Sequence, residues 1–219
     1  MIFIKNIVFL LSCIVINKYS KNKMFKNFRK IVLTALVVNS ILVSICYGQE
    51  EINTKDIIKK DNLAYKIGET EPFTGTEVAF FDNGNKFTQT PYVKGKIHGT
   101  EVIYYLNGNK FSETSFIFGK YNGKMTSYYD NGNIESEKYY INDYMNGGAV
   151  LWYRNGNKKS EGVFKDCHED GLWIFYYENG KKEREGEFNL GKRNGKWSYW
   201  DTEGNLIETK YFENDLIKK

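Results

Sequence analysis

Residues Gly171 to Asn194 read GLWIFYYENGKKEREGEFNLGKRN, and the chain after residue 74 consists of copies of this segment. The leading glycine recurs every 24 residues without insertion or deletion, at Gly75, Gly99, Gly123, Gly147, Gly171 and Gly195. We number the positions of each copy from zero at this glycine. A fixed period of this length is typical of repeat architectures, in which each unit packs mainly against its neighbours. The fold therefore follows from one unit and its stacking.

An Asn-Gly pair occupies positions eight and nine in five copies, and the last copy has Glu203-Gly204 there. Asn-Gly between two β-prone runs predicts a hairpin with a two-residue type I′ turn, because both residues tolerate positive φ. Each copy is therefore expected to be one β-hairpin. Counting outward from this turn pairs position six with eleven, five with twelve, three with fourteen and zero with seventeen.

Aromatic residues mark positions five and seventeen in every copy. The predicted register places Gly171 opposite Phe188, whose ring would cover the bare backbone of the glycine in an aromatic rescue. Positions three and five should share a face with position fourteen, which is Glu in four copies: Glu113, Glu137, Glu161 and Glu185. This face is expected to carry carboxylates spaced along an aromatic ladder.

The expected fold is all-β: an elongated single-layer antiparallel sheet of six tandem 24-residue hairpins over residues 63–219, preceded by an N-terminal apolar signal segment. Twelve or more strands at about 4.8 Å spacing would form a twisted ribbon roughly 55 to 60 Å long. Cys13 and Cys46 lie in the segment expected to be removed, so Cys167 would have no partner for an internal disulfide.

The pattern G-x-W-x-x-Y-Y-x-N-G-x-x-x-x-E, carried by residues 171–185, resembles the bacterial variant of the MORN repeat. Residues 63–75 look like the lead-in to the first such repeat. Many similar bacterial proteins carry the label of a YwqK-type antitoxin, so the resemblance implies a role as an antitoxin or as an immunity protein against a toxin. A membrane-surface role has also been proposed for other MORN proteins.

Residues 1–48 are interpreted as a signal or targeting segment. They contain seven Lys or Arg and no acid, which leaves 24 bases against 27 acids in the rest of the chain, a net charge of −3. Residues 24–30 form a basic n-region, residues 31–45 an apolar h-region, and Cys46-Tyr47-Gly48 fits cleavage before Gln49. Translation is then expected to start at Met24. Residues 49–62 are polar and are expected to be a linker.

Two other readings of this segment carry less weight. Lipoprotein cleavage before Cys46 needs a small preceding residue and finds Ile45. A membrane anchor needs about 20 apolar residues, which no uninterrupted run here supplies. We therefore expect export to the periplasm, cell envelope or exterior, with membrane contact only through the signal or a lipid anchor.

Little in the chain points to catalysis, because no G-x-S-x-G elbow, His-rich motif or phosphate loop occurs. The Cys167 to Asp170 cluster has metal-ligand residue types, but adjacent residues rarely converge on a tetrahedral site, so a polar turn is expected. Basic residues between Lys181 and Lys196 alternate with acids, which argues against nucleic-acid binding. The prediction is no enzyme, no cofactor and no metal.

Rows of Tyr and Trp are typical of protein interfaces and sugar-binding platforms. We expect an exported, non-catalytic MORN-repeat protein that acts as a protein–protein interaction or scaffold module, with a partner of unknown identity. The candidate interaction surface comprises Tyr104, Tyr128, Trp152, Trp173, Tyr176, Trp197 and Trp200. The alternatives are the antitoxin or immunity role, a glycan- or membrane-surface-binding module, and a plain spacer whose rings cover one another.

Overall fold

The computed structural model describes residues 50–218, and the signal segment predicted for residues 1–48 lies outside them. The described chain forms one 15-stranded sheet and a separate two-stranded sheet, β2–β3. The elements are β1 (Glu51–Asn53), η1 (Thr54–Asp56), β2 (Ile57–Lys60), β3 (Leu63–Lys66), β4 (Gly75–Phe80), β5 (Lys86–Val93), β6 (Lys96–Ile97), β7 (Gly99–Tyr104), β8 (Lys110–Ile117), β9 (Lys120–Tyr128), β10 (Ile134–Ile141), β11 (Tyr144–Trp152), β12 (Lys158–Lys165), β13 (His168–Tyr176), β14 (Lys182–Asn189), β15 (Lys192–Trp200), β16 (Leu206–Glu213) and β17 (Leu216–Ile217).

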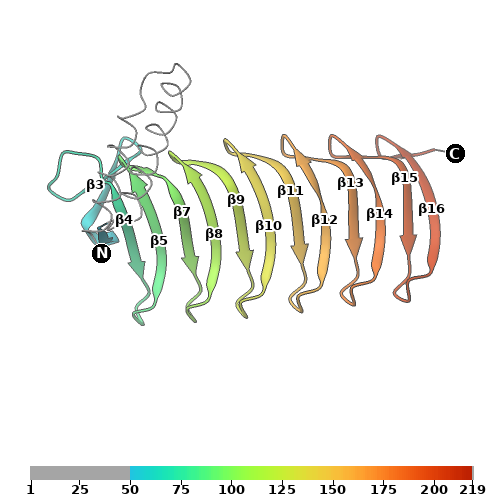
Figure 1. Ribbon diagram of the computed structural model, residues 1–219, viewed down its shortest axis with the longest axis horizontal. Coiled ribbons are helices and arrows are strands. Elements are labelled where there is room, and N and C mark those ends of the chain that lie inside the picture. The colour runs from blue at the N-terminus through green and yellow to red at the C-terminus, as the bar shows by residue number, and fades with distance from the viewer. Residues whose placement is uncertain (1–49, 219) are drawn as a thin grey trace, which may run out of the picture. The chain divides into compact units, whose positions relative to one another are not determined.

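Figure 1 shows the strands from β4 to β16, apart from the two-residue β6, standing side by side in one row, in chain order. All pairs in this row are antiparallel, so the six expected hairpins form one continuous meander. Gly171 pairs with Phe188 and Ile174 with Glu185, which confirms the predicted register at positions zero and three. Within residues 50–218 no helix is long and apolar enough to cross a bilayer.

The Asn-Gly turn differs from the predicted type I′ turn. The Gly180 N–H donates to the Tyr177 carbonyl at 2.9 Å, and the Tyr177 N–H donates to the Lys181 carbonyl at 2.8 Å. Gly180 has φ of 84°, whereas Asn179 does not have positive φ. This geometry is a three-residue loop, in which a type I turn is followed by a glycine bulge. The loop uses one residue more than expected, so Tyr176 faces Lys182, and the predicted pairs five–twelve and six–eleven are wrong.

Type I′ geometry occurs instead at the opposite ends of the strands, in the turns that join consecutive hairpins. Asn142 and Asp143, at positions nineteen and twenty, both have positive φ, 49° and 73°. Both residues of every equivalent pair have positive φ too: Lys94-Gly95, Phe118-Gly119, Asp166-Cys167, Leu190-Gly191 and Asn214-Asp215. Two-residue turns of this type match the twist of the flanking strands. They therefore continue the sheet from one hairpin to the next.

The asparagines of the Asn-Gly turn tie each turn to the following one. Asn131 Oδ1 accepts the Asn133 N–H at 3.0 Å, and its Nδ2 donates to the Arg154 carbonyl at 3.3 Å. Asn133 Nδ2 donates to the same carbonyl at 3.0 Å. The first, second and fourth turns have the same arrangement. Asparagine is thus used here for its side-chain amide, which links neighbouring repeats.

Aromatic rescue occurs in the sheet, but not at the predicted place. No atom lies within 4 Å of the point that a Cβ on Gly171 would occupy, so the Phe188 ring does not cover this glycine. Instead, Trp197 lies over Gly186 and Trp173 over Gly162, so closely that a Cβ on either glycine would overlap the indole. Each contact joins position fifteen of one repeat to position two of the next, and therefore ties adjacent hairpins together.

Residues 50–62 do not form the linker predicted for residues 49–62. β1 pairs in parallel with β4, and β2 pairs with β3 in a hairpin. These segments cover the first strand of the array with a small buried cluster of Ile52, Ala64, Phe73 and Tyr92. The composition of the segment is polar overall, but its few apolar residues, such as Ile52, make the contacts that pack it against the array.

Candidate interaction surface

Five of the seven predicted surface residues line up at position five of consecutive hairpins: Tyr104, Tyr128, Trp152, Tyr176 and Trp200. All five are half-buried. Because each repeat contributes two strands, equivalent residues are spaced by about 9.6 Å across the sheet. Strand alternation places positions one, three and five on one face of the sheet, and strand pairing places positions fourteen and sixteen on the same face. We call this face the ladder face.

Trp173 and Trp197, the other two predicted residues, do not belong to this surface. They lie on the opposite face, with only 4% and 1% of their surface exposed. Trp197 packs edge-on against Phe188 at 5.0 Å between ring centroids, and its Nε1–H donates to the Glu187 carbonyl at 3.2 Å. Positions two and five are an odd number of residues apart, so their side chains point to opposite faces. That parity was available from the sequence.

The expected carboxylates do lie along the aromatic row, and two of the four, Glu113 and Glu161, bond to it. Tyr176 Oη donates to Glu161 Oε1 at 2.6 Å, and Lys158 Nζ lies 2.7 Å from Glu161 Oε2. Tyr128, Glu113 and Lys110 repeat this arrangement two hairpins earlier. Tyr128 and Tyr176 thus bond to the glutamate of the preceding repeat, whereas Tyr104 Oη donates to Gln89 Oε1 at 3.4 Å. Charge-assisted bonds of the first kind are stronger than neutral ones.

These contacts fix the protonation states of the row. The hydrogen bond from Lys158, followed by that from Tyr176, holds the pKa of Glu161 below its ordinary value. Burial, followed by the bond to Glu161, raises the pKa of Tyr176 to about 12. The carboxylate is therefore ionised and the phenol neutral at physiological pH. Because each group is already paired, the row provides a fixed surface rather than a proton relay.

A second row of tyrosines stiffens the same strands from position six. Tyr153 Oη donates to the Tyr176 carbonyl of the next repeat at 2.8 Å. The same bond is made by three further tyrosines: Tyr105, Tyr129 and Tyr177. Four of the five position-five residues, Tyr128, Trp152, Tyr176 and Trp200, are therefore also held through their backbone carbonyls.

The ladder face is hollowed at one point that the sequence reading missed. Gly148 occupies position one, where other copies have Thr, Lys or Leu, and no atom lies within 4 Å of the point that a Cβ there would occupy. A hollow of about 280 Å³ opens at this glycine, and its lining includes Val150, Glu161, Val163, Leu172 and Ile174. The glycine at position one in a single copy was the available signal.

Exposed apolar side chains border the hollow. Leu172 is 54% exposed and Val163 46%, and both line it. Tyr139 is 44% exposed, and its Cβ lies 3.2 Å from the point that a Cβ on the neighbouring Gly147 would occupy. We call Tyr139, Gly148, Val150, Val163, Leu172 and Ile174 the apolar patch. Exposed apolar patches of this kind often mark interaction sites.

The described residues offer no alternative centre with metal-binding chemistry. Between residues 50 and 218, no group of three or more His, Cys, Asp or Glu side chains is arranged to hold a metal ion. Cys167 lies exposed in a type I′ turn, where its Sγ accepts the Met145 N–H at 3.2 Å. His168 Nδ1 contacts the Asp166 carbonyl at 2.8 Å. The cluster at residues 167–170 is therefore built into the turn and the start of β13.

The family model of the MORN repeat variant matches four segments of the chain: residues 97–117, 121–142, 169–190 and 193–214. Each segment begins at position twenty-two of one copy and ends near the type I′ turn of the next. The hairpin that carries Gly148 lies between the second and third matched segments. No curated protein sequence matches the chain.

Proposed function

We propose that this chain is a non-catalytic protein-interaction or scaffold module, exported to the cell envelope or exterior, that binds its partner through the ladder face. The observation that carries the proposal is the apolar patch around Gly148. Its hollow of about 280 Å³ is lined mainly by aliphatic side chains, which suits an apolar side chain of a partner protein. The hydrogen-bonded row beside it provides a pre-formed surface.

Two features of the ladder face favour a protein partner over a glycan or a membrane. The hydroxyl groups of Tyr128 and Tyr176 are already bonded to glutamates, and their rings are half-buried, so little of the row is free to stack on sugars. Three lysines on or beside this face are paired with acids: Lys124 with Glu137, Lys158 with Glu161 and Lys182 with Glu185. A surface of balanced charge has little attraction for anionic lipid.

A charge placed in the hollow tests the proposal. Gly148→Lys should abolish partner binding without unfolding the sheet, because Lys124 and Lys196 occupy position one in other copies. Thr100→Lys is the matched control at the same position in the second repeat. Tagged full-length chain and both variants would be expressed in the native host, and proteins bound in envelope, medium and cytoplasm would be identified by mass spectrometry.

A partner retained by Thr100→Lys and lost by Gly148→Lys supports the proposal, and one retained equally by both contradicts it. Recovery in the envelope or medium with Gln49 as first residue supports export. An uncleaved cytoplasmic protein bound to a small toxic protein would favour the antitoxin role instead.

A further inference from the structure

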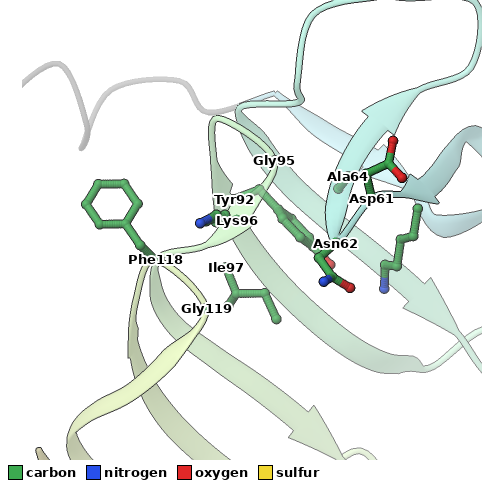
Figure 2. A pocket seen from close by; sticks show the side chains of 10 residues that line it. Asp61, Asn62, Ala64, Tyr92, Gly95, Lys96, Ile97, Phe118 and Gly119 are labelled. Carbon is green, nitrogen blue, oxygen red and sulfur yellow. The ribbon is translucent and has the colours of Figure 1, made fainter. Parts of the chain in front are cut away.

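A pocket of about 560 Å³ lies at the start of the array, away from the apolar patch. It opens between the β2–β3 hairpin and the type I′ turns at Lys94-Gly95 and Phe118-Gly119 (Figure 2). Its apolar lining includes Tyr92 and Ile97, and its polar lining includes Lys59, Asn62 and Lys96. The volume lies within the range of small-ligand sites, and the lining combines apolar with polar side chains.

The equivalent turns of other repeats show which group lies beside the corresponding backbone N–H. Position twenty of one repeat faces the backbone N–H at position twenty-two of the preceding repeat. Asp143 Oδ1 accepts the Tyr121 N–H at 2.8 Å, and Asp215 Oδ1 accepts the Arg193 N–H at 3.1 Å. A carboxylate oxygen is thus the chain's own acceptor for this amide in two repeats.

In other repeats, a different group accepts the equivalent N–H or occupies the space beside it. Cys167 Sγ accepts the Met145 N–H at 3.2 Å, as noted for the turn before β13. Ahead of the first repeat, the Phe73 N–H donates to the Ala64 carbonyl at 2.8 Å. At Gly191, the carboxylate of Glu169 lies 3.6 Å from the point that a Cβ would occupy.

Gly119 is the exception among these positions in the described chain. It has no side chain to accept the Ile97 N–H, and no atom lies within 4 Å of the point that its Cβ would occupy. Both residues line the pocket. The place that a carboxylate fills at Asp143 and Asp215 is therefore open to the pocket at Gly119.

The charges around this place favour an anion. Lys96 has no carboxylate within ion-pair distance among residues 50–218, and Lys59 Nζ lies 3.6 Å from Glu77 Oε2. Asp61 is the one acid in the lining.

We propose that this pocket binds a carboxylate carried on an apolar group, with one carboxylate oxygen at the place beside Gly119 that Asp143 and Asp215 fill in their own repeats. The Ile97 N–H donates to that oxygen, Lys96 supplies a positive charge, and Tyr92 and Ile97 contact the apolar group. The C-terminal residue of a polypeptide and a free small acid both present this chemistry.

Titrations followed by NMR test the site directly. The probes are N-acetyl-leucine for a small acid and the peptide acetyl-Gly-Gly-Gly-Leu for a polypeptide end, each compared with its C-terminal amide. With the ¹⁵N-labelled full chain, the acids should shift the Ile97 and Gly119 amide signals saturably, whereas the amides should not. Tighter binding of the peptide would identify a polypeptide end as the source, and tighter binding of N-acetyl-leucine a small acid.

Gly119→Asp introduces the aspartate that the chain has at the equivalent positions 143 and 215, so the variant should fold. Its carboxylate should compete with the ligand and weaken binding by at least about tenfold. Gly191→Asp, at the equivalent position away from the pocket, is the matched control and should bind as the unmodified chain does. Lys96→Ala should also weaken binding. Equal binding by Gly119→Asp, equal binding of acids and amides, or no saturable shift with either acid would each overturn the proposal.

Discussion

Gly186 and Gly148 both lie within strands, but they differ in what surrounds them. A Cβ on Gly186 would overlap the Trp197 indole, whereas a Cβ on Gly148 would meet nothing within 4 Å. Neither glycine has positive φ, so the backbone at both sites accepts other residues. Glycine is therefore required at position fifteen for packing of the tryptophan, and its use at position one opens the hollow.

Replacing each of these glycines with alanine should give opposite results. Gly186→Ala forces the Trp197 ring out of place and should lower the free energy of unfolding by about 2 to 3 kcal/mol. Gly148→Ala should leave it unchanged or raise it by about 0.5 kcal/mol, because alanine has less backbone entropy to lose. Urea unfolding followed by tryptophan fluorescence compares the two. A similar loss in both would contradict the packing role of Gly186.

The tyrosines of the ladder face should make the fold sensitive to alkali. Burial and the glutamate bonds raise the pKa of Tyr128 and of Tyr176 from 10.0 to about 12 in the folded chain. Between these values the unfolded chain loses protons that the folded chain keeps, so stability falls as pH rises from about 10 to 12. The double variant Tyr128→Phe/Tyr176→Phe should show a shallower fall in thermal midpoint over this range, and an unchanged slope would contradict the assignment.

At the scale of the hairpin, the sequence predicts where the strands pair but not the shape of the turn between them. Asn-Gly suits both a type I′ turn and a type I turn with a glycine bulge, and these differ by one residue. The pairs far from the turn, such as Gly171 with Phe188, are as predicted, and those next to it are shifted. Five of the six turns add asparagine bonds to the next repeat. The last turn, at Glu203-Gly204, forms the same three-residue loop without such a bond, so these bonds do not select the turn type.

These bonds predict a cost for removing one asparagine. Asn131→Ala loses the acceptor for the Asn133 N–H and the donor to the Arg154 carbonyl. Both bonds are exposed, so the expected loss is about 1 kcal/mol of unfolding free energy. Glu203→Ala is the matched control, because Glu203 occupies the same position in the last turn and its carboxylate bonds only to Thr202. Equal effects in thermal denaturation would contradict the turn-to-turn role of asparagine.

The candidate surface was predictable only in part, because the sequence shows which face of a strand a residue lies on but not the space between adjacent hairpins. The period places the position-five residues in one row, and strand alternation would have excluded Trp173 and Trp197 from it. The hollow at Gly148 and the open place at Gly119 depend on how a missing side chain leaves space between adjacent hairpins. Comparison of the copies marks Gly148 as the one glycine at position one, but spacing along one strand does not give the space that it leaves.

Across the whole molecule, each hairpin of the array contacts mainly its two neighbours in the row. The bonds between repeats recur with the same partners at the same interval, as in the turns and the tyrosine rows. Stability should then be close to a sum over repeats and their interfaces. One complete repeat should therefore be removable without loss of the fold.

Deletion of residues 123–146 removes one 24-residue period and joins Asn122 to Gly147. The shortened chain should fold, with a lower free energy of unfolding and a smaller urea m-value, because less surface is buried. Deletion of residues 123–134 removes half a period, brings unlike turns together and should disrupt the sheet. Circular dichroism and urea titration measure both. Failure of the 24-residue deletion to fold would contradict additivity along the array.

The meander also determines how the array would respond to a pulling force. When the two ends of the row are drawn apart, the load falls across the strands, and the hydrogen bonds at the outermost strand open one after another instead of sharing the force. Each released repeat of 24 residues adds about 80 Å of extended chain. The array should therefore lengthen in regular steps at low force, as an extensible tether does.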